Sequence, residues 1–235
     1  MSFFSWLSKS STLNSQQLAQ IERLKQFKQR PLNSLDSQRI VVVDVETTGL
    51  NMLKDKVLSI GAVVIEKGCI TLNQSFYCTL NRNDVGVTPS VLIHKISPSQ
   101  MAEGLNPQDA LIAFLAFIGD SPLLAFHALF DKGMLQRECK ELLNFKLTNV
   151  FYDVAELAPL LMAPLNNPPT QLDEWVNYFK LTNNQRHSAL ADAFVTAEIA
   201  LILLNKARKK SILEFSQLDH ALYEKRKHLK QNFSF

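Results

Sequence analysis

The sequence is poor in cysteine, glycine and proline. Its 235 residues include only 3 Cys, 7 Gly and 9 Pro, which excludes a disulfide-rich scaffold and a collagen-like or linker-rich chain. The cysteines, at positions 69, 78 and 139, are odd in number and lack the Cys-x-x-Cys spacing of a zinc site. We therefore expect a protein of the reducing cytoplasm.

The sequence also lacks a long hydrophobic run. The longest nearly uninterrupted apolar stretch, residues 111–118, is far shorter than the roughly 20 residues of a membrane-spanning helix. Residues 1–7 are hydrophobic, but no basic residues precede them and no small-residue cleavage site follows, so we expect no secretion signal. With 46% hydrophobic and 20% charged residues, the composition predicts a globular protein that does not enter a membrane.

Charge is distributed unevenly along the chain, although the net charge is only +3. Residues 1–39 carry six Lys or Arg and two acids, and residues 206–235 carry eight and three. Residues 40–205 hold the remaining eleven bases and seventeen acids. Basic ends around an acidic middle favour a polyanionic partner at the periphery and a cation at the centre. The alternative is an ordinary solvated surface.

The apolar periodicity changes along the chain and predicts the order of helices and strands. Apolar residues recur at helical spacing in residues 13–30, which predicts an amphipathic helix. Residues 40–45 are β-branched and almost continuously apolar, which is typical of a strand buried on both faces. Further strands are expected at 57–65, 69–80, 122–126 and 150–154, and further helices at 107–118, 130–143, 171–179 and 189–204. This order predicts an α/β fold with helices packed around a mixed sheet.

Two acids interrupt the end of the predicted central strand. Asp44 and Glu46 are two residues apart, so their side chains point to the same face of the strand. Neighbouring carboxylates repel unless a proton or a cation compensates them, and hard divalent cations prefer oxygen ligands. The sequence therefore predicts a cation site, and the alternative is a solvated strand end that leads into the turn at 47–50.

Two further acids occur at the starts of predicted helices. Asp131 follows the strand end at 122–126, where an acid can simply cap a helix or interact with its dipole. His187 and Asp192 are five residues apart, about 500° around a helix, and would not share a helical face. This spacing favours His187 on the loop, Ser188 as N-cap and Asp192 one turn into the helix, facing the sheet. An acid on the apolar side of an Ala/Leu-rich helix indicates a function.

In order and spacing these motifs resemble the DEDDh family of 3′–5′ exonucleases, the DnaQ-like group that includes the proofreading epsilon subunit of bacterial DNA polymerase III. Residues 44–50, Asp-Val-Glu-Thr-Thr-Gly-Leu, resemble the first motif of the family. Phe130 and Asp131 resemble the end of the second motif, and residues 187–192, His-Ser-Ala-Leu-Ala-Asp, resemble the third. Residues 89–97 are similar to a segment seen between the first two motifs.

The resemblance covers about residues 38–206, which are predicted to form the exonuclease domain. We expect an N-terminal helical extension at 1–37 and a basic C-terminal helical tail at 207–235. The resemblance implies a ribonuclease H-like fold, in which a five-stranded mixed sheet is flanked by helices.

The resemblance also implies a site for two divalent cations, Mg²⁺ or Mn²⁺. Asp44 would bridge the two ions, Glu46 and Asp192 would complete one site, and Asp131 would support the other, partly through water. His187 would take a proton from the water that attacks the terminal phosphodiester. The expected product is a nucleoside 5′-monophosphate.

Substrate contacts are implied at the edge of this site. Thr47 and Leu50 match positions at which the family holds the 3′-terminal nucleotide. One position departs from the family pattern: members often carry His-Asn five and four residues before the second-motif acid, where this chain has Phe126 and His127. His127 would replace the missing substrate contact, or it would simply pack at the strand end.

The basic tail contains two clusters of cations separated by apolar residues. The first cluster is Lys206, Arg208, Lys209 and Lys210, and the second is Lys225, Arg226, Lys227 and Lys230. We expect these cations to contact the phosphates of a long single strand. The apolar residues between them, Ile212, Phe215, Leu218 and Leu222, predict a helix that packs one face on the domain.

The sequence thus predicts a metal-dependent 3′–5′ exonuclease that acts on single-stranded ends, with DNA as the expected substrate in proofreading or repair. An RNA-directed enzyme, of the oligoribonuclease or tRNA-trimming type, would share every catalytic residue. A polymerase-associated nucleic-acid-binding module is the other alternative, although such a module needs neither the four acids nor His187. A DNA polymerase subunit is the candidate protein partner. The sequence leaves the strand length, the oligomeric state and the role of the N-terminal extension open.

Overall fold

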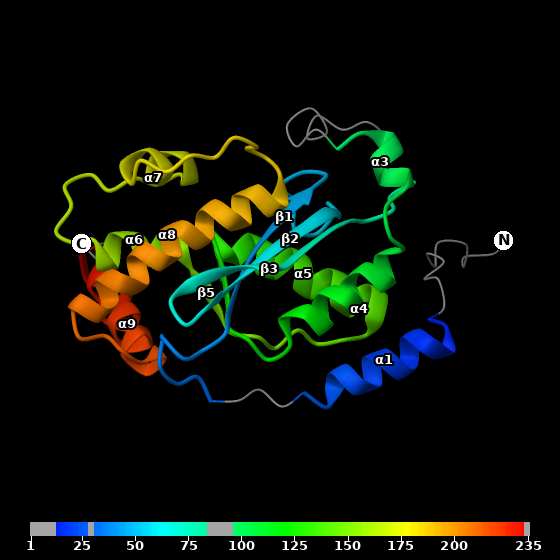
Figure 1. Ribbon diagram of the computed structural model, residues 1–235, viewed down its shortest axis with the longest axis horizontal. Coiled ribbons are helices and arrows are strands. Elements are labelled where there is room, and N and C mark those ends of the chain that lie inside the picture. Colours follow the sequence, from blue (N-terminus) through cyan, green and yellow to red (C-terminus); the bar gives the residue numbers. More distant parts are fainter. Residues whose placement is uncertain (1–12, 28–30, 84–95, 233–235) are drawn as a thin grey trace.

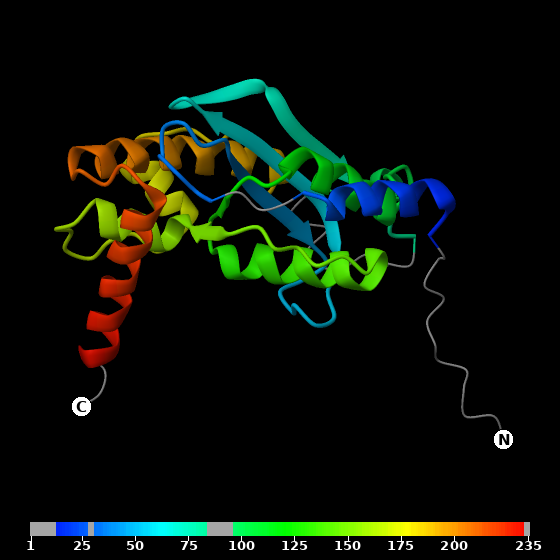
Figure 2. The same cartoon turned by 90° about the horizontal axis from the view of Figure 1, so that it is seen from below.

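The structure is a computed structural model that describes residues 13–27, 31–83 and 96–232. The family-like segment at 89–97 lies outside the described residues apart from its last two positions, and so do residues 1–12 of the predicted extension. Figures 1 and 2 show a central sheet between two layers of helices.

The sheet has five strands in the order β3-β2-β1-β4-β5. Strands β1 (Ile40–Thr47), β2 (Val57–Glu66) and β3 (Cys69–Thr79) form an antiparallel meander. The short strand β4 (Leu123–Ala125) pairs with β1 in parallel orientation, and β5 (Phe151–Asp153) pairs with β4 in the same way. The expected five-stranded mixed sheet is therefore confirmed.

Strand β1 is central and buried on both faces, as its continuous apolar run predicts. Val41 and Val43 belong to a core formed with α4 (Pro107–Ile118) and α5 (Ala128–Leu143). Ile40 and Val42 belong to the opposite core, which includes the long helix α8 (Ala189–Lys209). Because side chains alternate along a strand, Asp44 and Glu46 continue the face that packs on α8.

The remaining helices extend these two layers. On the α4 side lies α1 (Ser15–Lys25), where the Gln17 amide donates to the Asp109 carboxylate at 2.7 Å. On the α8 side lie α6 (Val154–Leu161), α7 (Leu172–Tyr178) and α9 (Phe215–Asn232), and α3 (Pro98–Ala102) is a short helix before α4. No described helix is both long and apolar enough to span a membrane.

Several boundaries differ from the sequence-based expectations. Helix α1 ends at Lys25, and α8 continues through its basic last turn to Lys209 instead of ending at 204. Helix α6 was not expected, because Pro159 lies inside it and a proline normally interrupts a helix. Its buried apolar face packs in the α8 core and stabilises it there.

The C-terminal tail packs on the domain with its apolar face. Phe215, Leu218 and Leu222 of α9 are buried and belong to the α8-side core. The expected docking of this helix is therefore confirmed. Figure 1 shows α9 at the end of the molecule to which α8 leads, away from the start of α8.

Candidate active site

Three acids from two elements converge at one end of the sheet. Asp44 and Glu46 lie at the end of β1, and Asp192 lies in the first turn of α8. One carboxylate oxygen from each residue lies within 4.8 Å of the others. The expectation that Asp44 and Glu46 share a face, with Asp192 turned toward them, is confirmed.

The position of Asp192 depends on close packing between α8 and β2. A Cβ atom on Gly61 of β2 would lie 2.2 Å from the backbone of Ala189 and Leu190. Glycine is therefore required at this position of β2, against which α8 begins. Helix α8 starts after Ser188, as expected, although the Ser188 side chain makes no capping hydrogen bond.

His187 lies on the loop before α8, where the sequence places it. It has a left-handed backbone with φ of 64°, which is uncommon outside glycine. This conformation lets the His187 N–H donate to Asp192 Oδ2 at 3.2 Å. The backbone of the predicted general base is thus held by one of the predicted metal ligands.

Asp131 joins the site from α5 on the other face of the sheet. It is buried, and its Oδ1 accepts the backbone N–H of Val45 at 3.1 Å. Asp131 is therefore tied to the strand between Asp44 and Glu46 and does more than interact with its own helix dipole. A cavity of about 490 Å³ is lined by all four acids together with His187.

Little positive charge compensates the four carboxyl groups, and their pKa values are raised. Burial, followed by the charges of Asp131, Glu46 and Asp192, raises the pKa of Asp44 well above its ordinary value. Burial also raises the pKa of Glu46 to about 7 and the pKa of Asp131 to about 8. Burial raises the pKa of Asp192 as well, although the Arg186 charge opposes this shift. Not all four groups are ionised at neutral pH without an added cation.

One cation that the sequence analysis missed lies among these acids. The Arg186 guanidinium donates to Asp192 and also to Asp173, which lies on α7. Asn183 donates from its amide to Asp192 Oδ1 at 2.5 Å. Both oxygens of Asp192 are thus bound by the loop that precedes α8. A basic residue next to His187 was the signal that could have indicated Arg186, but a loop arginine is usually exposed.

The chemistry of the donor set fits hard divalent cations. Three carboxylates converge and a fourth lies in the same cavity, and oxygen ligands of this kind suit Mg²⁺ or Mn²⁺. Arg186 supplies one positive charge where two divalent cations would supply four. The residues expected from the sequence therefore meet the requirements of such a site.

The predicted substrate contacts lie at the edge of the cavity. Leu50 projects from the loop after β1 with 87% of its surface exposed, and it lines the cavity with the exposed His127. Thr47 is buried, and its hydroxyl donates to the Gly49 carbonyl at 2.7 Å, which shapes the turn. The side chain of Thr47 is therefore engaged within the protein, whereas Leu50 and His127 face solvent.

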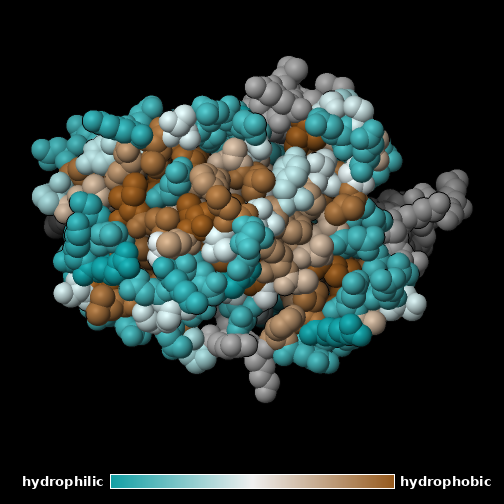
Figure 3. Space-filling view, viewed as in Figure 1, coloured by the Kyte–Doolittle hydropathy of each residue, from teal (hydrophilic) through white to brown (hydrophobic). Residues whose placement is uncertain are grey.

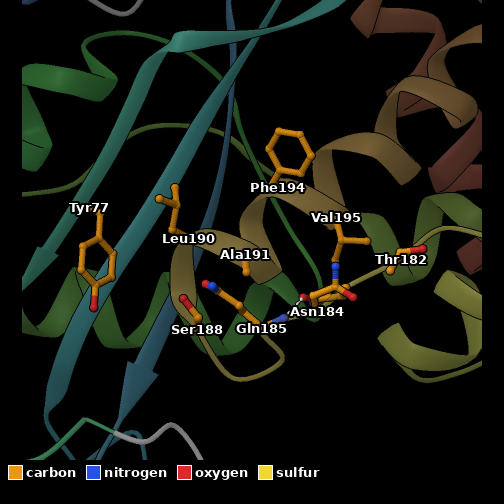
Figure 4. A pocket seen from close by; sticks show the side chains of 10 residues that line it. Tyr77, Thr182, Asn184, Gln185, Ser188, Leu190, Ala191, Phe194 and Val195 are labelled. Carbon is orange, nitrogen blue, oxygen red and sulfur yellow. Dashed lines mark hydrogen bonds between the residues drawn. The ribbon is translucent and has the colours of Figure 1, made fainter.

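A second cavity lies on the other side of the 182–188 loop. It measures about 590 Å³ and lies between Tyr77 of β3 and Leu190 and Phe194 of α8 (Figure 4). None of the described residues that line it is charged, and apolar side chains also gather over α8 in Figure 3. Asn183 lines this cavity and bonds to Asp192. Residues of this loop thus line both the acidic cavity and the uncharged one.

Comparisons with known proteins agree with this geometry. The model of the exonuclease family RNase_T matches residues 41–200. The DNA polymerase III PolC-type of Caldanaerobacter subterraneus subsp. tengcongensis is 30% identical over 188 residues, which is 79% of this chain and 13% of that protein. The DNA polymerase III subunit epsilon of Buchnera aphidicola subsp. Acyrthosiphon pisum is 25% identical over 177 residues, which is 72% of this chain and 74% of that protein.

A solved structure shows the same fold. The zinc-bound crystal structure of the E. coli ExoI–ssDNA complex matches with a TM-score of 0.62 and 17% identity, over 75% of this chain and 42% of that chain. This likeness confirms the expected ribonuclease H-like fold. The chain spans only 13% of the length of the PolC-type relative.

Proposed function

The chain belongs to the RNase_T exonuclease family, and on this premise we propose that it is a metal-dependent 3′–5′ exonuclease that acts on single-stranded DNA ends. The observation that carries the proposal is the convergence of Asp44, Glu46 and Asp192 within 4.8 Å, in one cavity with Asp131 and His187. A module that only bound nucleic acid would gain nothing from burying four acids together.

Asp44, Glu46 and Asp192 would hold one divalent cation, and Asp131 with Asp44 would hold a second. When bound, these cations stabilise the negative charge that develops on the phosphate and on the leaving oxygen. Arg186 would leave Asp192 when the cation arrives. Its second contact with Asp173 on α7 gives the guanidinium a place to remain.

His187 would act as the general base. A water molecule attacks the phosphorus of the terminal phosphodiester, and the imidazole accepts the proton that this water loses. The bond from phosphorus to the 3′-oxygen breaks, and the 3′-oxygen takes a proton from solvent. The product is a nucleoside 5′-monophosphate and a strand shortened by one nucleotide. The hydrogen bond from the His187 backbone to Asp192 fixes the base beside the acids.

The edge of the cavity suits a 3′-terminal nucleotide. Leu50 offers an exposed apolar side chain against which the terminal base would pack, and His127 stands across the cavity as a donor or acceptor. Support for DNA as the substrate comes from the names of the similar proteins, a DNA polymerase III subunit and an ExoI–ssDNA complex. The similarity to a DNA polymerase III subunit also supports a DNA polymerase as the protein partner.

Side-by-side degradation of DNA and RNA tests this proposal. Strands of one sequence, labelled at the 5′ end, are incubated with Mg²⁺ or Mn²⁺, and Asp44→Asn serves as the inactive control. We expect the DNA strand to shorten one nucleotide at a time from its 3′ end, faster than RNA. Faster loss of RNA would support an RNA-directed enzyme instead. Equal degradation in excess EDTA would contradict the proposed metal-dependent chemistry.

A further inference from the structure

A third cavity, of about 510 Å³, adjoins the active-site cavity. It lies between the first turns of α5, the strand β5, the start of α6 and the tail helix α9. Its lining residues are Ala128, Leu129, Lys132, Phe151, Asp153, Glu156 and Arg226.

The two cavities share a wall at the start of α5. His127 lines the active-site cavity, and Ala128 and Leu129, which follow it in the chain, line this one. The His127 N–H donates to Asp153 Oδ1 at 3.0 Å, and Asp153 also lines the third cavity. A strand that leaves the active site past His127 therefore meets this cavity next.

The lining offers an apolar surface with a cation at its edge. Leu129 is 78% exposed, and the half-buried Phe151 ring lies beside it in the wall. The ammonium group of Lys132 lies 5.8 Å from the centre of the Phe151 ring. Within the described part of the chain, Lys132 has no acidic partner. The Phe151 ring is covered by this ammonium group, so the exposed Leu129 is the apolar surface on which a nucleotide base can pack, while its phosphate meets Lys132.

The two acids of the cavity are already engaged. Asp153 accepts the N–H groups of His127 and Ala155, at 3.0 and 2.9 Å. Glu156 accepts two hydrogen bonds from the Arg226 guanidinium, both at 2.6 Å. This pairing fixes the plane of the Arg226 guanidinium in the cavity wall. Lys132 is left as the cation that can meet an incoming phosphate.

The tail helix completes this cavity, and its described lining includes no residue of the first basic cluster. Arg226 lies on α9, outside the residues 41–200 that match the family. Lys206 and Lys209 lie at the far end of α8 from Asp192, about 20 and about 25 Å along the helix axis. Of the second basic cluster, Arg226 lines this cavity.

We propose that the cavity between α5, β5 and α9 binds a nucleotide upstream of the 3′ end, with its base against Leu129 and its phosphate at Lys132, while Arg226 of α9 forms the wall. This inference rests on the proposed function, because it takes the bound strand to be the substrate. It assigns the tail helix to strand binding, so the length of strand that the enzyme grips depends on α9.

Equilibrium binding to labelled DNA strands of two to ten nucleotides tests the subsite. Measurements use Asp44→Asn, which would bind strands without degrading them, and compare it with the same protein carrying Lys132→Gln. We expect the second change to weaken binding of the longer strands about 3-fold or more and to lower the slope of log affinity against log salt by about 0.7. The loss should shrink toward the dinucleotide.

Lys67→Gln is the matched control, because it removes the same charge from an exposed position in the turn between β2 and β3, at the opposite end of the sheet from Asp44 and Glu46. It should change neither affinity nor salt slope. Equal losses from Lys132→Gln and Lys67→Gln would show a general charge effect and would overturn the subsite. Thermal melting of each variant verifies the fold.

A second measurement locates the base. Strands with a single abasic position are compared, and the position whose base occupies the cavity should cost about 5-fold or more in affinity. In Leu129→Ser that penalty should fall, whereas penalties at other positions stay. If wild-type protein shortens DNA from the 3′ end but no such position exists, the subsite is wrong and the proposed function stands. If wild-type protein releases no nucleotide from DNA, the proposed function itself fails.

Discussion

Within the described part of the chain, the buried acid Glu138 and the four acids of the candidate site are compensated in different ways. Glu138 of α5 accepts the backbone N–H of Val57 at 3.2 Å and the Arg82 guanidinium at 2.8 Å, with Arg137 at 3.8 Å. The four acids of the candidate site have only Arg186 beside them in the lining of their cavity. One buried acid thus has two arginines, and four acids have one. Acids that serve structure are paired when buried, so the uncompensated charge of the site acids supports the proposed cation site.

The largest effect should follow from neutralising one carboxylate among the four acids of the candidate site. Asp44→Asn, Glu46→Gln, Asp131→Asn and Asp192→Asn should each lower mononucleotide release by more than the roughly 100-fold limit typical of residues that only support a ligand. Because carboxylate repulsion falls, Asp44→Asn should also melt at a higher temperature than wild type in EDTA. An Asp44→Asn protein that is inactive but less stable without metal would show a structural role for this acid.

The next largest effect concerns His187, which lies beside the four acids and is proposed as the general base. His187→Ala should lose about 10²–10⁴-fold in turnover, the range for a positioned general base, and a higher pH should partly restore it. Stabilisation by Mn²⁺ should survive, because the four carboxylates remain. Loss of Mn²⁺ binding in this variant would make His187 a ligand and would contradict its assignment as base.

For Glu138, the buried acid that is paired with arginines, removing charge should lower stability and leave metal binding unchanged. The side chains of Arg82 and Glu138 are only 7% and 5% exposed, so Arg82→Met leaves a buried charge with one partner fewer. It should cost about 3–5 kcal/mol of unfolding free energy, measured by denaturant titration. The double variant Arg82→Met with Glu138→Leu should recover part of this loss. Mn²⁺ should stabilise both variants as much as wild type, since the site acids are unchanged.

The smallest effect is the pH dependence of the metal-free protein. Because the pKa values of Glu46 and Asp131 are raised to about 7 and about 8, the folded state holds more protons than the unfolded state between about pH 4 and 8. The unfolding free energy should therefore fall as the pH rises through this window. Melting in EDTA at pH 5, 6, 7 and 8 checks the sign, and Mn²⁺ should flatten the trend. A rise in stability across the same window would contradict the crowding of the acids.

The fold was largely predictable because its central elements carry strong local signals. Strand β1 is β-branched and continuously apolar, and α8 is long and rich in Ala and Leu. Helix α6 could not be predicted, because Pro159 weakens its local signal and its packing partners are distant in the sequence. Local patterns identify elements that are stable in any context, and they miss elements stabilised mainly by tertiary packing.

The residues of the site also differ in whether the sequence alone indicated them. The spacing of Asp44 and Glu46 on the strand and of Asp192 on the helix indicated these three acids, whereas Asp131 and the role of His187 were indicated by the resemblance to the DEDDh family. Arg186 could not be assigned to the site, since a loop arginine reaches Asp192 only through the left-handed turn that follows it. The requirement for Gly61 depends on contact with α8, more than a hundred residues later. Such pairings become visible only when the chain is folded.

The most direct test of the central claim is a count of Mn²⁺ ions bound per chain, measured by the electron paramagnetic resonance of free Mn²⁺ during titration. The acids Asp44, Glu46, Asp131 and Asp192 should bind two ions in the wild-type protein. Asp44→Asn should bind fewer and more weakly, because the Asp44 carboxylate would contribute to both sites. Equal Mn²⁺ binding by wild type and Asp44→Asn would contradict the claim that these acids form a metal centre.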